Sequence, residues 1–171
     1  MKDNGRERTA AAVWETAKGA MYRAAYSVLK NQEDAEDAVM DAMVRIIKSE
    51  EKFSGLASNE MTALAVIYAR NTAINIYNAN RKRPFPIEEL PDVPGMTSAE
   101  EEAAGRDAEE RMLRLIELMP PSYRDALMLR VRFGMSVTEI AEVLGIGSGA
   151  VRTRLSRARQ WLKKHEGGED T

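Results

Sequence analysis

The 171-residue chain contains no cysteine and a single histidine, His165, near its C-terminal end. Without cysteine there are no disulfide bonds, thiolate metal sites or cysteine nucleophiles. One histidine in that position leaves no basis for a histidine-based triad or metal cluster, and the sequence has no glycine-rich phosphate loop. We therefore expect a protein that is not an enzyme and that holds no cofactor and no metal.

The chain also lacks a long apolar run. None approaches the roughly 20 residues that a membrane-spanning helix needs, and the first ten residues lack the apolar core of a signal peptide. Hydrophobic residues make up 44% of the sequence and charged residues 30%, values typical of a globular protein. We expect a cytoplasmic protein that does not insert into a membrane.

The formal net charge of the whole chain is only −2, but three segments carry charges of a single sign. Residues 61–87 carry four basic and no acidic side chains, and residues 151–164 carry six basic and none acidic. Residues 86–105 instead carry six acidic and no basic side chains. The near-neutral average is therefore a cancellation between basic segments, which suit nucleic acid, and acidic ones.

Alternating patterns typical of strands are absent, whereas apolar residues recur at helical spacing along most of the chain. This periodicity predicts helices over residues 14–28, 33–47, 59–80, 108–119, 122–133, 136–144 and 149–164. Four prolines and a glycine interrupt the pattern between residues 84 and 95. We predict an all-α fold with two small helical domains, 1–85 and 106–166, joined by an acidic flexible linker, 86–105.

The most informative local pattern lies near the C-terminal end. Ser136 and Glu139 have the spacing of a capping box, which begins a helix that ends at Gly145. Ala141, Gly145 and Val151 fit a helix-turn-helix, because a small residue, a turn glycine and an apolar plug are needed where its helices meet. The side chains expected to face outward and reach base edges are Arg152, Thr153, Ser156, Arg157 and Gln160. Those expected at phosphates are Arg154, Arg159, Lys163 and Lys164.

Longer stretches of the sequence resemble a known family. PPSYRDALMLRVRFGMSVTEIAEVLGI (120–146) and GAVRTRLSRAR (149–159) resemble domain 4 of a bacterial RNA polymerase sigma factor. NQEDAEDAV (31–39) and YARNTAIN (68–75) resemble domain 2 of the same family. The length and the order of these motifs resemble the extracytoplasmic-function (ECF) group of the sigma-70 family, which consists of these two domains and a linker.

The resemblance implies partners and site residues. Core RNA polymerase would be bound at its β′ clamp helices by Asp34, Glu36, Asp37, Ala38 and Asp41, and also at its β flap. The −10 promoter DNA would be contacted by Arg70, Asn71, Asn75, Asn78, Arg81, Lys82 and Arg83, with Phe53 in the loop that captures a flipped base. The −35 DNA would be contacted by Arg152, Thr153, Arg154, Ser156, Arg157, Arg159 and Lys163. An anti-sigma factor is a further implied partner.

We therefore expect an ECF-type sigma factor, which binds core polymerase, recognises −35 and −10 promoter DNA and assists promoter melting. One alternative is a sigma-like adaptor or decoy that sequesters an anti-sigma factor, because Asn78 and Ala79 stand where the family often has arginines. Run-off transcription would separate these two. A second alternative is a one-component helix-turn-helix regulator, which would be a dimer on palindromic sites.

Overall fold

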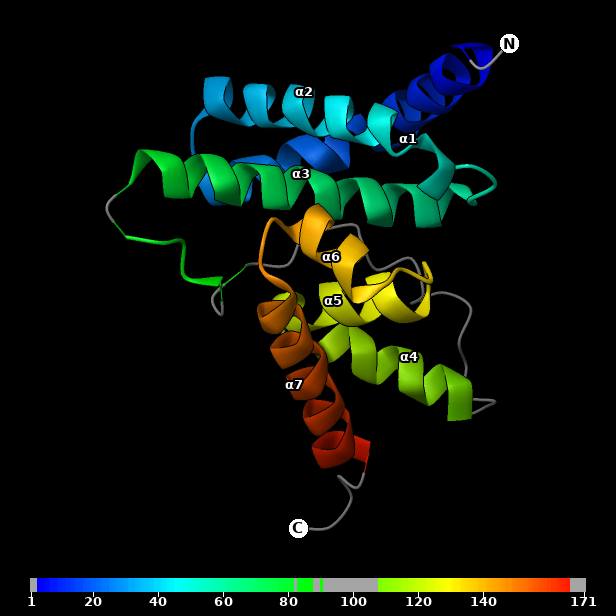
Figure 1. The fold of residues 1–171 in the computed structure, drawn as a ribbon, viewed down its shortest axis with the longest axis vertical. Helices are drawn as coiled ribbons and strands as arrows, with labels where there is room; N and C mark the ends of the chain where they lie inside the picture. Colours follow the sequence, from blue (N-terminus) through cyan, green and yellow to red (C-terminus); the bar gives the residue numbers. More distant parts are fainter. Residues whose placement is uncertain (1–2, 82, 88–89, 91–107, 167–171) are drawn as a thin grey trace. The chain divides into compact units, whose positions relative to one another are not determined.

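The computed structural model describes residues 3–81, 83–87, 90 and 108–166. Over these residues the chain forms seven α-helices and one short 3₁₀-helix, with no strand, which confirms the predicted all-α class (Figure 1). None of the described helices combines the length and the apolarity that a membrane crossing requires. Lys82 and nearly all of the predicted linker, 86–105, lie outside the described residues.

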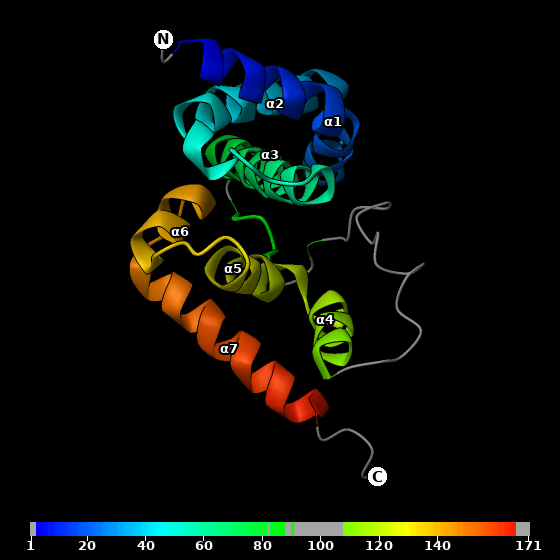
Figure 2. The same ribbon diagram turned by 90° about the vertical axis from the view of Figure 1, so that its right-hand side faces the viewer.

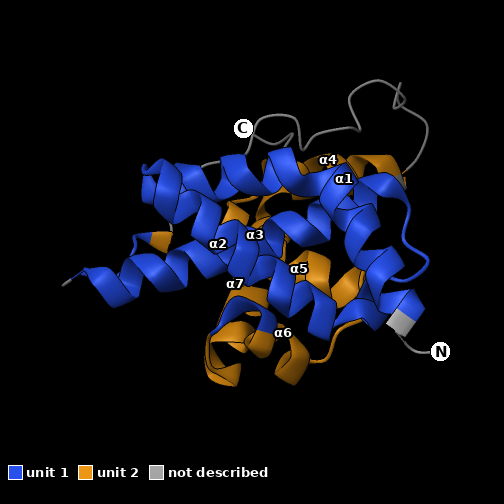
Figure 3. Cartoon of the chain, turned by 90° about the horizontal axis from the view of Figure 1, so that it is seen from above, with its two compact units in different colours: residues 1–86, 93–96, 143–145 blue, residues 87–92, 97–142, 146–171 orange. Residues whose placement is uncertain are grey.

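The helices fall into two compact units, which Figure 3 colours separately. The first unit contains α1 (Asp3–Leu29), α2 (Gln32–Lys48), the 3₁₀-helix η1 (Glu50–Lys52) and α3 (Ser58–Asn80). The second unit is built from α4 (Ala108–Leu118), α5 (Pro121–Val131), most of α6 (Val137–Leu144) and α7 (Ser148–Glu166). Each unit buries apolar side chains of its own.

The first unit is a bundle in which α1 packs against α2 and α3, and α2 against α3 (Figure 2). Alanine dominates its buried positions, which lets the helix backbones approach closely; Ala20 and Ala24 of α1 pack with Val66 of α3. The periodicity of the sequence includes Trp14 in the apolar stripe of the first helix, but Val13 fills the core in its place. It includes both Ile46 and Ile47 in that of the second helix, but of the two isoleucines only Ile46 is buried. Trp14 is 36% exposed and Ile47 39% exposed.

The turn between α1 and α2 ends in a capped helix start. Asn31 is the N-cap of α2, because its side-chain oxygen accepts a hydrogen bond of 2.9 Å from the backbone N–H of Asp34. Lys30 makes the turn with a φ of 55°, in the left-handed region. Glu33 and Asp34 lie in the first turn of α2, where the helix dipole stabilises negative charge.

The second unit is held together by packing of α4 and α5 against α7. Met119, Leu127 and Ala158 form its buried cluster, and partly buried apolar side chains surround it: Ile116, Tyr123, Trp161 and Leu162. The cluster joins Met119, just before α5, and Leu127, in the second half of α5, to the middle of α7. It therefore fixes which side of α7 faces away from the unit.

The predicted capping box begins α6. The backbone N–H of Ser136 donates to Glu139 Oε2 at 2.8 Å, and the N–H of Glu139 donates to Ser136 Oγ at 3.1 Å. At the other end, Gly145 has a φ of 66°, and the N–H of Ile146 donates to the carbonyl of Ala141 at 3.1 Å. A glycine at this turn allows the chain to leave α6 and enter α7 within three residues, as a helix-turn-helix requires.

Candidate nucleic-acid and partner interfaces

The buried and exposed sides of α7 are clearly separated. Val151, Leu155 and Ala158 are buried at spacings of four and three, and they turn one side of the helix into the unit. Six of the residues predicted for −35 DNA are exposed on the rest of the helix: Arg152, Thr153, Ser156, Arg157, Arg159 and Lys163. We call these six the basic face of α7, because four of them are basic and the acid-free segment 151–164 contains them all.

Arg154 lies apart from the basic face. It is only partly exposed, and burial lowers the pKa of its guanidinium, whereas the charges of Asp125 and Tyr123 on α5 act in the opposite direction. Asp125 is itself 5% exposed, so its carboxylate needs a cation nearby. Arg154 therefore lies partly buried near α5, and the phosphate contact expected for it from the sequence stays a prediction.

The C-terminal end of α3 forms a second basic surface. Asn75, Asn78, Arg81 and Arg83, all expected at −10 DNA, are exposed. The guanidinium of Arg81 lies over the ring of Tyr77, with 4.9 Å from Cζ to the ring centroid.

The chain folds back immediately after this surface. The N–H of Phe85 donates to Asn78 Oδ1 at 2.7 Å, and its ring meets Tyr77 edge-on at 5.2 Å. Sequence reasoning missed Tyr77 and Phe85 as parts of this surface. The four-residue spacing from Tyr77 to Arg81 was the only local signal for it.

Three of the residues expected at −10 DNA are not at a surface. Arg70 is 3% exposed and Asn71 4% exposed, and the Asn71 amide donates to the carbonyl of Ile67 at 2.8 Å. Phe53 is fully buried, with its ring centroid 5.6 Å from that of Tyr68. The Phe53 side chain is therefore part of the core, because the turn after η1 directs it inward. We correct these three assignments accordingly.

The outer side of α2 carries the acidic residues expected at polymerase. Glu36, Asp37 and Asp41 are exposed and Asp34 is partly exposed, but Ala38 is fully buried, because it faces the bundle core. The expectation that Ala38 contacts a partner is therefore wrong. Despite this acidic cluster, no group of three or more His, Asp or Glu side chains in the described part of the chain is placed to hold a metal ion.

Apolar side chains are exposed beside these acids. Met40 is 57% exposed, Val44 51% and Ile47 39%, and their spacing of four and three residues lines them up along α2. We call these three residues the apolar stripe of α2. Helical residues of this kind are normally buried, so an exposed row of them beside carboxylates is typical of a surface that binds a partner.

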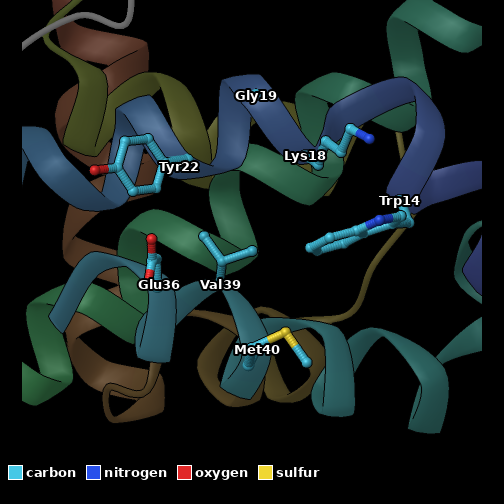
Figure 4. Close-up of a pocket in the computed structure, with 7 residues that line it drawn as sticks. All are labelled: Trp14, Lys18, Gly19, Tyr22, Glu36, Val39 and Met40. Atoms are coloured by element: carbon cyan, nitrogen blue, oxygen red, sulfur yellow. The ribbon is translucent and has the colours of Figure 1, made fainter. Parts of the chain in front are cut away.

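A groove between α1 and α2 begins at Met40, at one end of the apolar stripe. Figure 4 shows Trp14 facing Met40 at one end of this groove and Tyr22 facing Glu36 at the other, with Val39 between them. The ammonium of Lys18 lies 5.9 Å from the centre of the Trp14 ring. The groove continues the apolar surface of α2 toward α1.

A helical unit followed by a helix-turn-helix unit with a basic face defines a DNA-binding class of helical proteins. Two family models match the chain: Sigma-70 region 2 over residues 13–83 and Sigma-70, region 4, over residues 109–162. The chain belongs to the sigma-70 family of RNA polymerase sigma factors, in its ECF group.

Known proteins of this group resemble the chain over much of its length. The ECF RNA polymerase sigma factor SigD of Mycobacterium tuberculosis is 32% identical over 130 residues, which cover 75% of this chain and 61% of SigD. The RNA polymerase sigma-E factor of Streptomyces avermitilis is 28% identical over 153 residues, 87% of this chain and 80% of that protein. The chain thus spans less than two thirds of SigD.

Among solved structures, the co-crystal structure of the sigma factor RpoE with the anti-sigma factor NepR from Bartonella quintana aligns over 99% of this chain and 100% of that chain. Its sequence identity is 20% and its TM-score 0.43. At that score the likeness adds nothing to the family assignment.

Proposed function

We propose that this protein is an ECF-type sigma factor that acts in the cytoplasm. It binds core RNA polymerase, directs it to promoters by recognising −35 and −10 DNA, and assists melting of the duplex without chemistry of its own. Residues 1–85 would serve as sigma domain 2, residues 106–166 as sigma domain 4 and residues 86–105 as the linker. An anti-sigma factor would control its access to polymerase.

The observation that carries this proposal is the basic face of α7. A helix-turn-helix inserts the N-terminal part of its second helix into the major groove, where arginine can bond guanine in a bidentate manner. Arg152, Ser156 and Arg157 lie in that part of α7 and are exposed. Lys163 lies further along the helix and is better suited to a phosphate, which positions the helix without reading sequence.

The −10 contacts would come from the exposed end of α3. Arg81 and Arg83 supply charge for phosphates, and Asn75 and Asn78 supply amides for bases or backbone. Because Arg70, Asn71 and Phe53 are buried, we leave them out of this surface.

Core polymerase would bind α2. The carboxylates of Asp37 and Asp41 lie along one side of the apolar stripe, so this surface suits a partner helix that carries a row of basic residues beside a row of apolar ones. The clamp helices of the β′ subunit are the partner that membership of the family implies.

Run-off transcription with purified core polymerase tests the function directly. We expect promoter-dependent transcripts that require this protein. Their absence, together with tight binding of an anti-sigma protein, would support the adaptor or decoy instead. A dimer that binds palindromic DNA without polymerase would support the one-component regulator.

Matched variants test whether the basic face of α7 contacts promoter DNA and whether α2 contacts core polymerase. Arg152→Ala should cost about 1–3 kcal/mol of binding free energy at the cognate promoter and relax its sequence preference, whereas Lys163→Ala should weaken binding to all sequences alike.

Asp37→Lys should reduce binding to core polymerase by about tenfold or more, because it places a positive charge where the partner is basic. Glu7→Lys makes the same charge change at an exposed site on α1 and should leave that binding unchanged.

A further inference from the structure

Tyr123 occupies an unusual position between the core of the second unit and the basic face of α7. It lies in the first turn of α5, two residues after Pro121, and its backbone N–H donates to the Pro120 carbonyl at 3.0 Å. Its ring packs against the buried cluster of Met119, Leu127 and Ala158. A tyrosine has only two side-chain torsions, so a ring held in this way gives its hydroxyl a defined place.

The hydroxyl of Tyr123 meets a residue of the basic face. Arg157 Nη1 donates a hydrogen bond to Tyr123 Oη at 3.3 Å, across 34 residues of sequence. A guanidinium has five N–H donors, of which bidentate recognition of guanine uses two. The bond to Tyr123 uses one of these donors and orients the Arg157 side chain.

A second arginine of α7 lies close to the same part of α5. Arg154, one helical turn before Arg157, is partly buried, which lowers the pKa of its guanidinium, and Asp125 and Tyr123 lie near enough to act in the opposite direction. A side-chain hydrogen bond between α5 and this side of α7 runs from Arg157 to Tyr123, and it sets the direction of the Arg157 side chain.

We propose that Tyr123 is a positioning residue for promoter recognition: through its hydroxyl it holds the Arg157 guanidinium in the orientation that reads a base in the −35 major groove. The inference rests on the proposed function. An exposed arginine otherwise loses rotamer freedom on binding, and a residue that orders it beforehand lowers that cost. Sequence discrimination should therefore depend on a residue that lies outside the helix-turn-helix.

The test compares Tyr123→Phe, which keeps the ring and removes the hydroxyl, with the unmodified protein. In the free full-length chain, ¹⁵N relaxation of the Arg157 side-chain Nε–Hε group reports its order, and we expect the order parameter to fall in the variant. In reconstituted holoenzyme, preference for the cognate promoter over one substituted at the base read by Arg157 should fall about three- to tenfold, the loss of one hydrogen bond. Binding to non-promoter DNA should not change.

Two controls separate positioning from a structural effect. Tyr26→Phe removes the same group from an exposed tyrosine on α1 and should change neither measurement. In an Arg157→Ala background, Tyr123→Phe should cause no further loss of preference, since the effect passes through Arg157. The melting temperature checks that Tyr123→Phe remains folded.

An unchanged order parameter of Arg157 in Tyr123→Phe would overturn the inference. So would a loss of promoter preference that is as large when Tyr123→Phe is added to Arg157→Ala as when it is added to the unmodified protein. Unchanged promoter preference in Tyr123→Phe would also overturn it if Arg157→Ala lowers that preference. If the unmodified protein supported no promoter-dependent transcript although Arg157 lost order in the variant, the proposed function would fail and only the Tyr123–Arg157 contact would stand.

Discussion

The guanidinium of Arg81 lies over the ring of Tyr77, one helical turn earlier in α3, with 4.9 Å between Cζ and the ring centroid. Arg81 is the C-cap residue of α3, a position at which a side chain is usually free to move. Stacking on Tyr77 holds its charge against the end of the helix. The proposed −10 surface is therefore organised by an aromatic ring before DNA binds.

Replacing Tyr77 by leucine should weaken promoter binding by the holoenzyme about two- to fivefold, because an exposed cation–π contact contributes roughly 0.5–1 kcal/mol. Tyr77→Phe keeps the ring and serves as the control, with unchanged affinity expected. Fluorescence anisotropy with labelled −10 DNA measures both variants. Equal losses in the two variants would show that the hydroxyl, not the ring face, matters.

Phe53→Ala should lower the free energy of unfolding by about 3–5 kcal/mol, because it empties a fully buried aromatic site beside Tyr68. Urea denaturation followed by circular dichroism measures this change. The neighbouring exposed Ser54 supplies a control, since Ser54→Ala should alter stability very little. A Phe53→Ala protein of normal stability that fails to melt promoters would restore the base-capture role for this side chain.

Ser136→Ala should destabilise the second unit by about 1 kcal/mol, because it removes the acceptor that caps the start of α6. Ser136→Asp retains an acceptor and should recover most of that stability. Thermal unfolding of both variants, beside Ser156→Ala on the exposed side of α7, measures the difference. If Ser156→Ala were as destabilising as Ser136→Ala, the cap would not be the cause.

Alkaline pH should destabilise the fold through Tyr68. Burial raises the pKa of its hydroxyl above the ordinary value of 10.0, although a hydrogen bond with Ser49 and the charge of Arg45 lower it. Above about pH 10 the unfolded chain therefore releases this proton before the folded chain does, and stability falls as pH rises through that range. Urea unfolding from about pH 9 to about pH 11 should show a shallower decline for Tyr68→Phe. If the free energy of unfolding declined with pH equally in the unmodified protein and in Tyr68→Phe, Tyr68 would be ruled out as the source.

Much of the helical architecture could be predicted because its signals are local. The bonds between Ser136 and Glu139 and the turn at Gly145 depend on residues a few positions apart, so their types and spacing are sufficient. Periodicity was less reliable where two large apolar residues are adjacent. Val13 and Trp14 differ by only 100° around a helix, and packing among three helices decided which of them is buried.

The site residues were harder to predict because exposure depends on tertiary packing. Ala38 and Met40 lie two residues apart on α2, yet the first is buried and the second is more than half exposed. Arg70 was expected at −10 DNA from the family resemblance, yet it is only 3% exposed. The bond between Tyr123 and Arg157 joins residues 34 positions apart, and no spacing rule along the sequence indicates it.

The apolar stripe of α2 has a consequence for the free protein. An exposed row of Met40, Val44 and Ile47 would favour association of two copies through this surface. The carboxylates of Asp37 and Asp41 lie beside the row, so two copies brought together there would confront like charges. The acids that we propose to attract a basic partner would thus also make self-association through this surface unfavourable.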